Sequence, residues 1–126
     1  MSRRAVFSSK APKPVGPYSQ AIVAGGFVFV SGQIPVDPST GELIDDIEKA
    51  TELVLENTRR ILEEAGSSLD KVVKVTVYLR DLSDFQLFNK VYSRYFPEAP
   101  PARSTLQAKL PKDARLMLDA IAIAGG

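Results

Sequence analysis

The sequence predicts an α+β fold, a mixed six-stranded sheet with two helices packed on one face. Apolar residues alternate, or run unbroken, in short segments near both ends of the chain and in its middle, which is typical of strands. Two longer segments repeat apolar residues every three or four positions, as amphipathic helices do. The composition, 44% hydrophobic and 25% charged over 126 residues, is typical of a single domain, and we assign residues 1–126 to it.

The first third of the chain predicts three strands. A short strand is expected over residues 4–7, and the prolines of residues 10–17 then favour extended or turned backbone. The next two apolar, β-branched runs, 20–24 and 27–31, are separated only by two glycines. A pair of glycines in this place is typical of a tight hairpin turn, whose residues need positive φ.

A long helix is predicted over residues 46–65, after a turn at residues 37–41. Asp45 lies three residues before Glu48 and supplies a capping pair, and Gly66 stands where a helix ends. The expected core-facing stripe consists of Ile47, Ala50, Val54, Ile61 and Ala65, with Leu55 and Leu62 beside it.

The second half of the chain predicts a strand, a helix and two further strands. Residues 73–80 alternate branched apolar with polar side chains, the clearest strand pattern in the sequence. Ser83 and Gln86 resemble a capping box for the helix, and strands are expected at 103–108 and 115–124. The apolar stripe of this second helix is aromatic: Phe85, Phe88, Tyr92 and Phe96. At helical spacing such a stripe indicates core packing rather than a surface for stacking bases.

The last predicted strand is apolar on both faces. One face carries Leu116, Leu118, Ala120 and Ala122, and the other carries Met117, Ile121 and Ile123 around Asp119. Two helices cover only one face of such a sheet, so the other face is left as a larger apolar patch than monomers usually expose. We therefore expect a homo-oligomer whose sheets pack inward.

The composition excludes several classes of chemistry. The chain has no Cys and no His, which excludes zinc fingers, haem and iron–sulfur sites and His-dependent nucleophilic triads. A net charge of +1 gives no electrostatic argument for nucleic acid, and the longest apolar stretch, 21–30, is too short to span a bilayer. No apolar signal core follows the N-terminal arginines, so we expect a cytoplasmic protein.

Two charged residues are the first candidates for chemistry. Arg103 begins a strand just after two prolines, and its planar guanidinium suits bidentate capture of a small carboxylate. The alternative is a surface arginine that is solvated or paired with Asp113. Asp119 interrupts an apolar strand face, where a carboxylate can act as a general acid or base. Its alternative is a structural aspartate at an edge or beside an arginine.

Polar residues at strand and helix ends are further candidates. Tyr18 lies in a stiff loop before a strand, where its hydroxyl can bond a ligand or a water, or its ring can cover the edge of the core. Ser31 and Gly32 end a strand and offer a hydroxyl and an unhindered N–H, although they are also ordinary turn residues. Asn89, beside the aromatic stripe, is either a buried structural residue or part of a site.

Six blocks, spread in order over the whole chain, together resemble the signature of the Rid family, the reactive intermediate deaminases also called the YjgF family. They are Gly16-Pro17-Tyr18-Ser19-Gln20-Ala21, Ser31-Gly32-Gln33-Ile34-Pro35, Asn89 with Tyr92 and Tyr95-Phe96, Pro101-Ala102-Arg103-Ser104, Leu110-Pro111-Lys112-Asp113 and Asp119-Ala120-Ile121-Ala122. The resemblance implies a chorismate-mutase-like (ferredoxin-like) fold, assembled as a homotrimer with ligand clefts between subunits.

For the RidA branch, the resemblance implies hydrolysis of reactive 2-imino and enamine acids such as 2-aminoacrylate to 2-oxoacids and ammonia. This is the activity of a 2-iminobutanoate/2-iminopropanoate deaminase, and it needs no cofactor or metal. Arg103 matches the carboxylate-binding arginine, a main-chain group near Thr105 would bind the imine nitrogen, and Asp119 would orient or activate the water. Tyr18 and Ser31 match cleft-lining residues, and Asn89 matches a supporting asparagine.

Two positions depart from the family pattern. Thr105 stands where many members carry Cys, which keeps a main-chain contact but changes the polarity of the pocket. Asp119 stands where RidA deaminases usually carry Glu and is one methylene shorter. A held water would sit differently, and a displacement of about 1 Å costs on the order of 100-fold in rate.

Other functions are weighed beside deamination. A regulatory trimer would use Arg103 to bind small carboxylates without turnover. RNA cleavage is described for some members of the family, but the near-zero net charge does not support it. A chorismate mutase activity rests on fold analogy alone.

Overall fold

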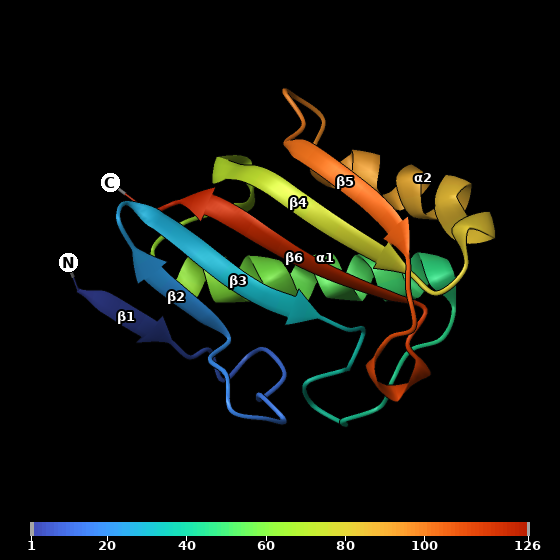
Figure 1. Ribbon diagram of the computed structural model, residues 1–126, viewed down its shortest axis with the longest axis horizontal. Coiled ribbons are helices and arrows are strands. Elements are labelled where there is room, and N and C mark those ends of the chain that lie inside the picture. Colours follow the sequence, from blue (N-terminus) through green and yellow to red (C-terminus); the bar gives the residue numbers. More distant parts are fainter. Residues whose placement is uncertain (1, 126) are drawn as a thin grey trace.

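The computed structural model describes residues 2–125, which form one sheet with two α-helices behind it (Figure 1). The strands are β1 (Arg3–Val6), β2 (Ala21–Ala24), β3 (Phe27–Gln33), β4 (Val72–Leu79), β5 (Ala102–Gln107) and β6 (Leu116–Ile123). The helices are α1 (Ile47–Glu64) and α2 (Phe85–Tyr95). Three short 3-10 helices lie at Leu69–Lys71, Leu82–Asp84 and Pro111–Asp113.

The sheet is mixed, with the strand order β1-β2-β3-β6-β4-β5. Only β4 and β5 pair in parallel, joined by a crossover through α2, and every other neighbouring pair is antiparallel. Figure 1 shows both helices on the same side of this sheet and the front face of the sheet uncovered. The predicted α+β fold, with two helices on one face of a six-stranded mixed sheet, is confirmed.

The core lies between the sheet and the helices. On β6, Leu116, Leu118, Ala120 and Ala122 are at most 2% exposed and face the helices. The whole predicted stripe of α1 is buried, so the periodicity of both elements located the core correctly. Within residues 2–125, neither helix combines the length and apolar composition that a bilayer span requires.

The predicted hairpin between β2 and β3 is confirmed. Gly25 and Gly26 have φ values of 58° and 85°, in the left-handed region that residues with a Cβ rarely adopt. The strands they join pair from Ala24 opposite Phe27 to Ala21 opposite Val30, one pair short of the predicted runs 20–24 and 27–31. This pairing brings the start of β2 next to the last residues of β3.

Both predicted capping motifs are wrong in detail. The N-cap of α1 is Asp46 rather than Asp45, since the Asp46 carboxylate accepts a hydrogen bond of 3.0 Å from the Lys49 amide. Ser83 does not cap α2, because it lies inside a 3-10 turn whose own cap is Asp81. At the start of α1, the neighbouring carboxylates Asp45 and Asp46 are both possible caps, and side-chain geometry selects Asp46. At the start of α2, the N-cap position belongs to Asp84, whose side chain makes no capping hydrogen bond.

The face expected for Val73, the first residue of the predicted strand, is wrong. Val73 is 39% exposed, whereas Val72 before it is buried. The pairing with β6 shifts between Val72 and Lys74, and such a bulge interrupts the strict alternation of faces. From Val75 onward, the predicted alternation holds.

The uncovered face of the sheet is rich in apolar side chains. The most exposed of these are Phe27, Phe29, Val73, Leu106 and Ile123, each between 39% and 49% exposed. On β6, Met117 and Ile121 lie half-buried on the same side. The second apolar face predicted for the last strand is therefore present, and the oligomer that would cover it stays a prediction.

Candidate functional site

The sheet separates the two charged residues of the predicted site. Arg103 on β5 lies opposite Val75 of β4, whose side chain is fully buried on the helix side. Asp119 on β6 lies opposite Thr76, the next residue of β4, which faces the uncovered side. Because successive side chains of a strand point to opposite faces, Arg103 and Asp119 lie on opposite faces of the sheet.

Arg103 is seated on an aromatic surface of α2. Its guanidinium carbon lies 5.6 Å from the ring centroid of Phe85, 5.4 Å from that of Phe88 and 4.8 Å from that of Tyr92. A cation over ring faces is attracted by their negative quadrupole. We call these three rings the aromatic seat. The aromatic stripe predicted for this helix is therefore part of the core at Phe88 and Tyr92. It also supports Arg103, a role that the sequence did not indicate.

The arginine of the seat has no acidic partner among residues 2–125. The salt bridges of the described residues, with a limit of 4.0 Å between N and O, do not include Arg103. Asp113, considered as its partner from the sequence, pairs with Arg80 at 3.2 Å. A half-buried guanidinium that is positioned by rings and not neutralised is suited to bind an anion.

A buried hydroxyl lies beside this guanidinium. Tyr92 is 6% exposed, and its hydroxyl has no hydrogen-bond partner among the described residues. Burial raises the pKa of Tyr92 more than the charge and the close polar contact of Arg103 lower it, so the phenol is neutral at pH 7. The contact with Arg103 falls outside the geometry of a hydrogen bond. A buried polar group without a partner is costly, and this one is available to a ligand held by Arg103.

Thr105 and Asn89 extend the helix-side group. Thr105 follows Arg103 by two residues on β5, which is an edge strand, and is half-buried. The Ala108 amide donates to the Leu79 carbonyl at 3.0 Å, so by the alternation of main-chain groups the N–H of Thr105 points away from β4, to the open edge. Asn89 is half-buried and directly follows Phe88 of the aromatic seat.

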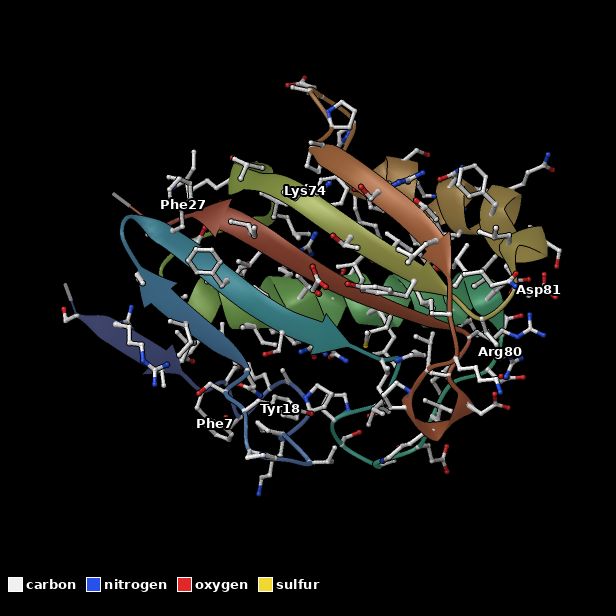
Figure 2. All side chains as sticks on the ribbon, in the orientation of Figure 1. Phe7, Tyr18, Phe27, Lys74, Arg80 and Asp81 are labelled. Atoms are coloured by element: carbon white, nitrogen blue, oxygen red, sulfur yellow. The ribbon has the colours of Figure 1, made fainter. Side chains whose placement is uncertain are left out.

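The other predicted residues gather around a cavity of about 370 Å³ on the uncovered side. It is lined by Val15, Tyr18, Ser31, Gly32, Ile34, Pro111, Met117 and Asp119. Figure 2 shows Tyr18 in the loop at the end of the sheet where β2 begins and β3 ends. Four of the seven predicted site residues thus share one cavity, and the remaining three belong to β5 and α2.

A buried glutamine fixes the loop that carries Tyr18. Gln20 is 1% exposed, and its side-chain amide donates to the carbonyls of Ser8 (3.1 Å) and Pro12 (2.9 Å). Its side-chain oxygen accepts from the Ser8 amide. Sequence reasoning missed this role, since an isolated glutamine before a strand looks like an ordinary loop residue.

The hydroxyls of Tyr18 and Ser31 at the cavity each make one hydrogen bond to the main chain of the loop. The Tyr18 hydroxyl accepts a bond of 3.3 Å from the Val15 amide, and 47% of the residue is exposed. The Ser31 hydroxyl donates to the Ser19 carbonyl at 2.6 Å. The Tyr18 proton and the Ser31 lone pairs are then available to a ligand.

Asp119 is held by a tyrosine. The Tyr78 hydroxyl donates to Asp119 Oδ2 at 3.0 Å, across the β4–β6 pair. This hydrogen bond, burial and the negative charge together raise the pKa of Tyr78. No cation of residues 2–125 lies within salt-bridge distance of Asp119, so the alternative of an arginine-paired aspartate is wrong. Tyr78 was not singled out from the sequence.

Comparison with known proteins assigns the family. Residues 8–124 match the model of the family described as Endoribonuclease L-PSP. A RutC family protein of Pyrococcus abyssi is 56% identical, with 97% of this chain and 98% of the relative covered. The Escherichia coli protein TdcF, whose name assigns it provisionally to the reactive intermediate deaminases, is 42% identical, with 96% and 97% covered.

Solved structures agree with this assignment. The crystal structure of E. coli TdcF with bound serine has a TM-score of 0.93 at 40% identity, covering 97% of this chain and 99% of that one. The YjgF gene product of E. coli has a TM-score of 0.92 at 37% identity, covering 95% and 98%. The chain belongs to the Rid family.

In this Rid-family chain, Gly32 is required by a close approach in the cavity wall. A Cβ at this position would lie 2.8 Å from the sulfur of Met117 and 3.0 Å from its Cγ. The clash is with the side chain of Met117, which lies on the neighbouring strand β6, two residues before Asp119. The absence of a side chain at residue 32 therefore keeps Met117 in place and the cavity open.

We expect Gly32→Ala to destabilise the fold by about 1–3 kcal/mol through overpacking. The clash is with Met117 alone, so Gly32→Ala should cost much less in a Met117→Ala background than in the wild type, although Met117→Ala has a cost of its own. Denaturant unfolding of the two single variants and the double variant, at one protein concentration, measures the coupling. Additive effects of the two substitutions would show that the contact does not determine the choice of glycine.

Proposed function

We propose that this chain hydrolyses reactive 2-imino and enamine acids of the 2-aminoacrylate type to 2-oxoacids and ammonia. The observation that carries the proposal is the unpaired guanidinium of Arg103 on its aromatic seat, a site suited to a substrate carboxylate. The reactive-intermediate-deaminase name of the relative TdcF supports the same class of reaction.

The proposed site is completed by a second copy of the chain. A 2-imino acid is small, and within one chain the sheet lies between Arg103 and Asp119. The exposed apolar face also requires cover. A homotrimer whose sheets pack inward would cover the apolar face. It would also bring the β5 edge of one copy, with Arg103, to the cavity of the next copy, with Asp119. Such a heterologous contact closes on itself after three copies.

In the proposed mechanism, each half of the site has its own task. Arg103 holds the carboxylate of the substrate, and the Thr105 main chain binds the imine nitrogen, with Asn89 supporting this half. From the neighbouring copy, Tyr18, Ser31 and Gly32 line the cleft, and Asp119 holds the attacking water. The imine carbon is already electrophilic, so the protein's contribution is orientation and one proton-transfer group.

An enamine acid first becomes the 2-imino acid as one proton leaves its nitrogen and one is added to its terminal carbon. From the imine onward, the proposed hydrolysis balances with water as the only co-substrate. As the water oxygen bonds to the imine carbon, one water proton passes to Asp119 and from there to the nitrogen. The resulting carbinolamine then loses ammonia: its C–N bond breaks while the hydroxyl proton passes to the departing nitrogen. The products are a 2-oxoacid and ammonia, and Asp119 returns to its starting state.

A second candidate function is binding of small carboxylates without turnover. The bound serine of the TdcF crystal structure favours it, because serine carries a carboxylate but no imine. In that case Arg103 would serve the same purpose and Asp119 would not matter for the chemistry. The endoribonuclease description of the family model favours RNA cleavage, but a net charge of +1 supplies no electrostatic attraction for a polyanion.

The first test is imine hydrolysis. A dehydratase that releases 2-aminoacrylate from serine should yield free 2-oxoacid faster when the protein is added, and Arg103→Ala should lower kcat/KM on the order of 100-fold. The matched control is Arg59→Ala, because Arg59 also lies over a tyrosine ring, Tyr95, but is paired with Glu56. Saturable binding of carboxylates without any acceleration would favour the second function instead.

The second test asks whether the site is shared between copies. Arg103→Ala and Asp119→Ala chains, each inactive alone, should regain activity when they are unfolded and refolded together. In a one-to-one mixture, about a quarter of the sites combine an intact Arg103 with an intact Asp119 from the neighbour. Mixing without refolding is the control. If both residues acted within one chain, refolding the mixture would restore nothing.

A further inference from the structure

Tyr78 is the one side chain of the described residues that hydrogen-bonds to Asp119. The two residues are not directly opposite in the β4–β6 pair: Thr76 faces Asp119, and Tyr78 faces Met117. The bond of 3.0 Å therefore runs diagonally between the strands, within the reach of a long aromatic side chain. Both residues are half-buried on the uncovered face.

The direction of this hydrogen bond is fixed. The pKa of Tyr78 is raised above its ordinary value, chiefly by the bond itself. The phenol is a donor at neutral pH and an ionised carboxylate can only accept, so Tyr78 donates and Oδ2 of Asp119 accepts. Oδ1 of Asp119 accepts no hydrogen bond from residues 2–125, and Asp119 lines the cavity that holds Tyr18 and Ser31.

We propose that Tyr78 is a positioning residue, which holds Oδ2 of Asp119 so that Oδ1 presents to the water of the cavity. The inference rests on the proposed function, since it assigns a task within that site. An unrestrained aspartate rotates about two bonds and spreads its oxygens over several positions. A donor bound to one oxygen selects one orientation, and catalysis depends strongly on such placement. Tyr78 thereby fixes the position of a carboxylate that is one methylene shorter than the glutamate usual at this position in RidA deaminases.

Kinetics test the inference. Tyr78→Phe removes only the hydroxyl and should lower kcat about ten-fold, the effect of losing one hydrogen bond to a charged group. KM should change by less than about two-fold, because Arg103 holds the carboxylate independently of Asp119. A general loss of structure would move both constants.

The chain offers a matched control. Tyr95 also donates its hydroxyl to a carboxylate, Glu56, at 2.8 Å, but this bond joins α2 to α1, and Tyr95 belongs neither to the aromatic seat nor to the cavity lining. Tyr95→Phe removes the same atom from the same kind of bond and should leave kcat unchanged. If Tyr78→Phe retains the wild-type kcat, or if both variants lose activity equally, the inference is overturned.

Tyrosine titration separates this inference from the proposed function. The chain has four tyrosines, and the ultraviolet difference between wild type and Tyr78→Phe isolates the ionisation of Tyr78. Its midpoint should move to lower pH in Asp119→Ala, because the carboxylate raises the pKa of the phenol. Failure of the wild type to hydrolyse imines, with this shift present, would refute the function but retain the Tyr78–Asp119 contact. An unchanged midpoint would overturn the inference whatever the activity.

Discussion

The constraint on which the rest of the structure depends is that two helices cover only one face of a six-stranded sheet. Side chains alternate between the faces, so every residue of β4, β5 and β6 belongs either to the core or to the uncovered side. The core side buries Leu118 and Val75. The same alternation places Arg103 toward α2 and Asp119 on the uncovered side. A shift of one residue in the register of a strand would move all of its side chains to the opposite faces.

Each half of the candidate site is held by packing that serves the fold as well. The buried aromatic residues of α2, Phe88 and Tyr92, belong to the core and also support the guanidinium of Arg103. Gln20 fastens the loop before β2 to the edge of the core and so places Tyr18 at the cavity. Functional groups on a prepared support lose little freedom when a ligand binds, which favours both binding and reaction.

Sequence reasoning predicted the elements well because hydrophobic periods of 2 and 3.6 reflect local geometry. The period of α1 assigned every buried apolar stripe residue correctly. The capping-box spacing from Asp45 to Glu48 favoured the wrong cap, because the carboxylate that accepts from a main-chain amide is that of Asp46, which lies outside this pattern. The alternation predicted for β4 also placed Val73 on the wrong face, because a bulge depends on pairing with a strand some fifty residues away.

The site residues that were missed are those defined by tertiary contacts. Arg103 and the aromatic stripe were each noted from the sequence, but their contact depends on how β5 packs against α2. Tyr78 looked like one polar residue in an alternating strand, since its bond to Asp119 spans 41 residues and depends on the β4–β6 register. A strand order in which β6 inserts between β3 and β4 is not encoded in local periodicity.

The separation of Arg103 from Asp119 has a chemical consequence. An arginine and an aspartate within reach of each other in one half-buried site would form a salt bridge, and each would then be occupied by the other. The sheet prevents this pairing within the chain, and both residues are left without an ionic partner among residues 2–125. In the proposed trimer, the two groups enter one cleft from different subunits and lie on either side of the substrate, whose carboxylate engages Arg103 while a water engages Asp119. A chain without His or Cys thus keeps a cation and a carboxylate available for a substrate that is itself reactive.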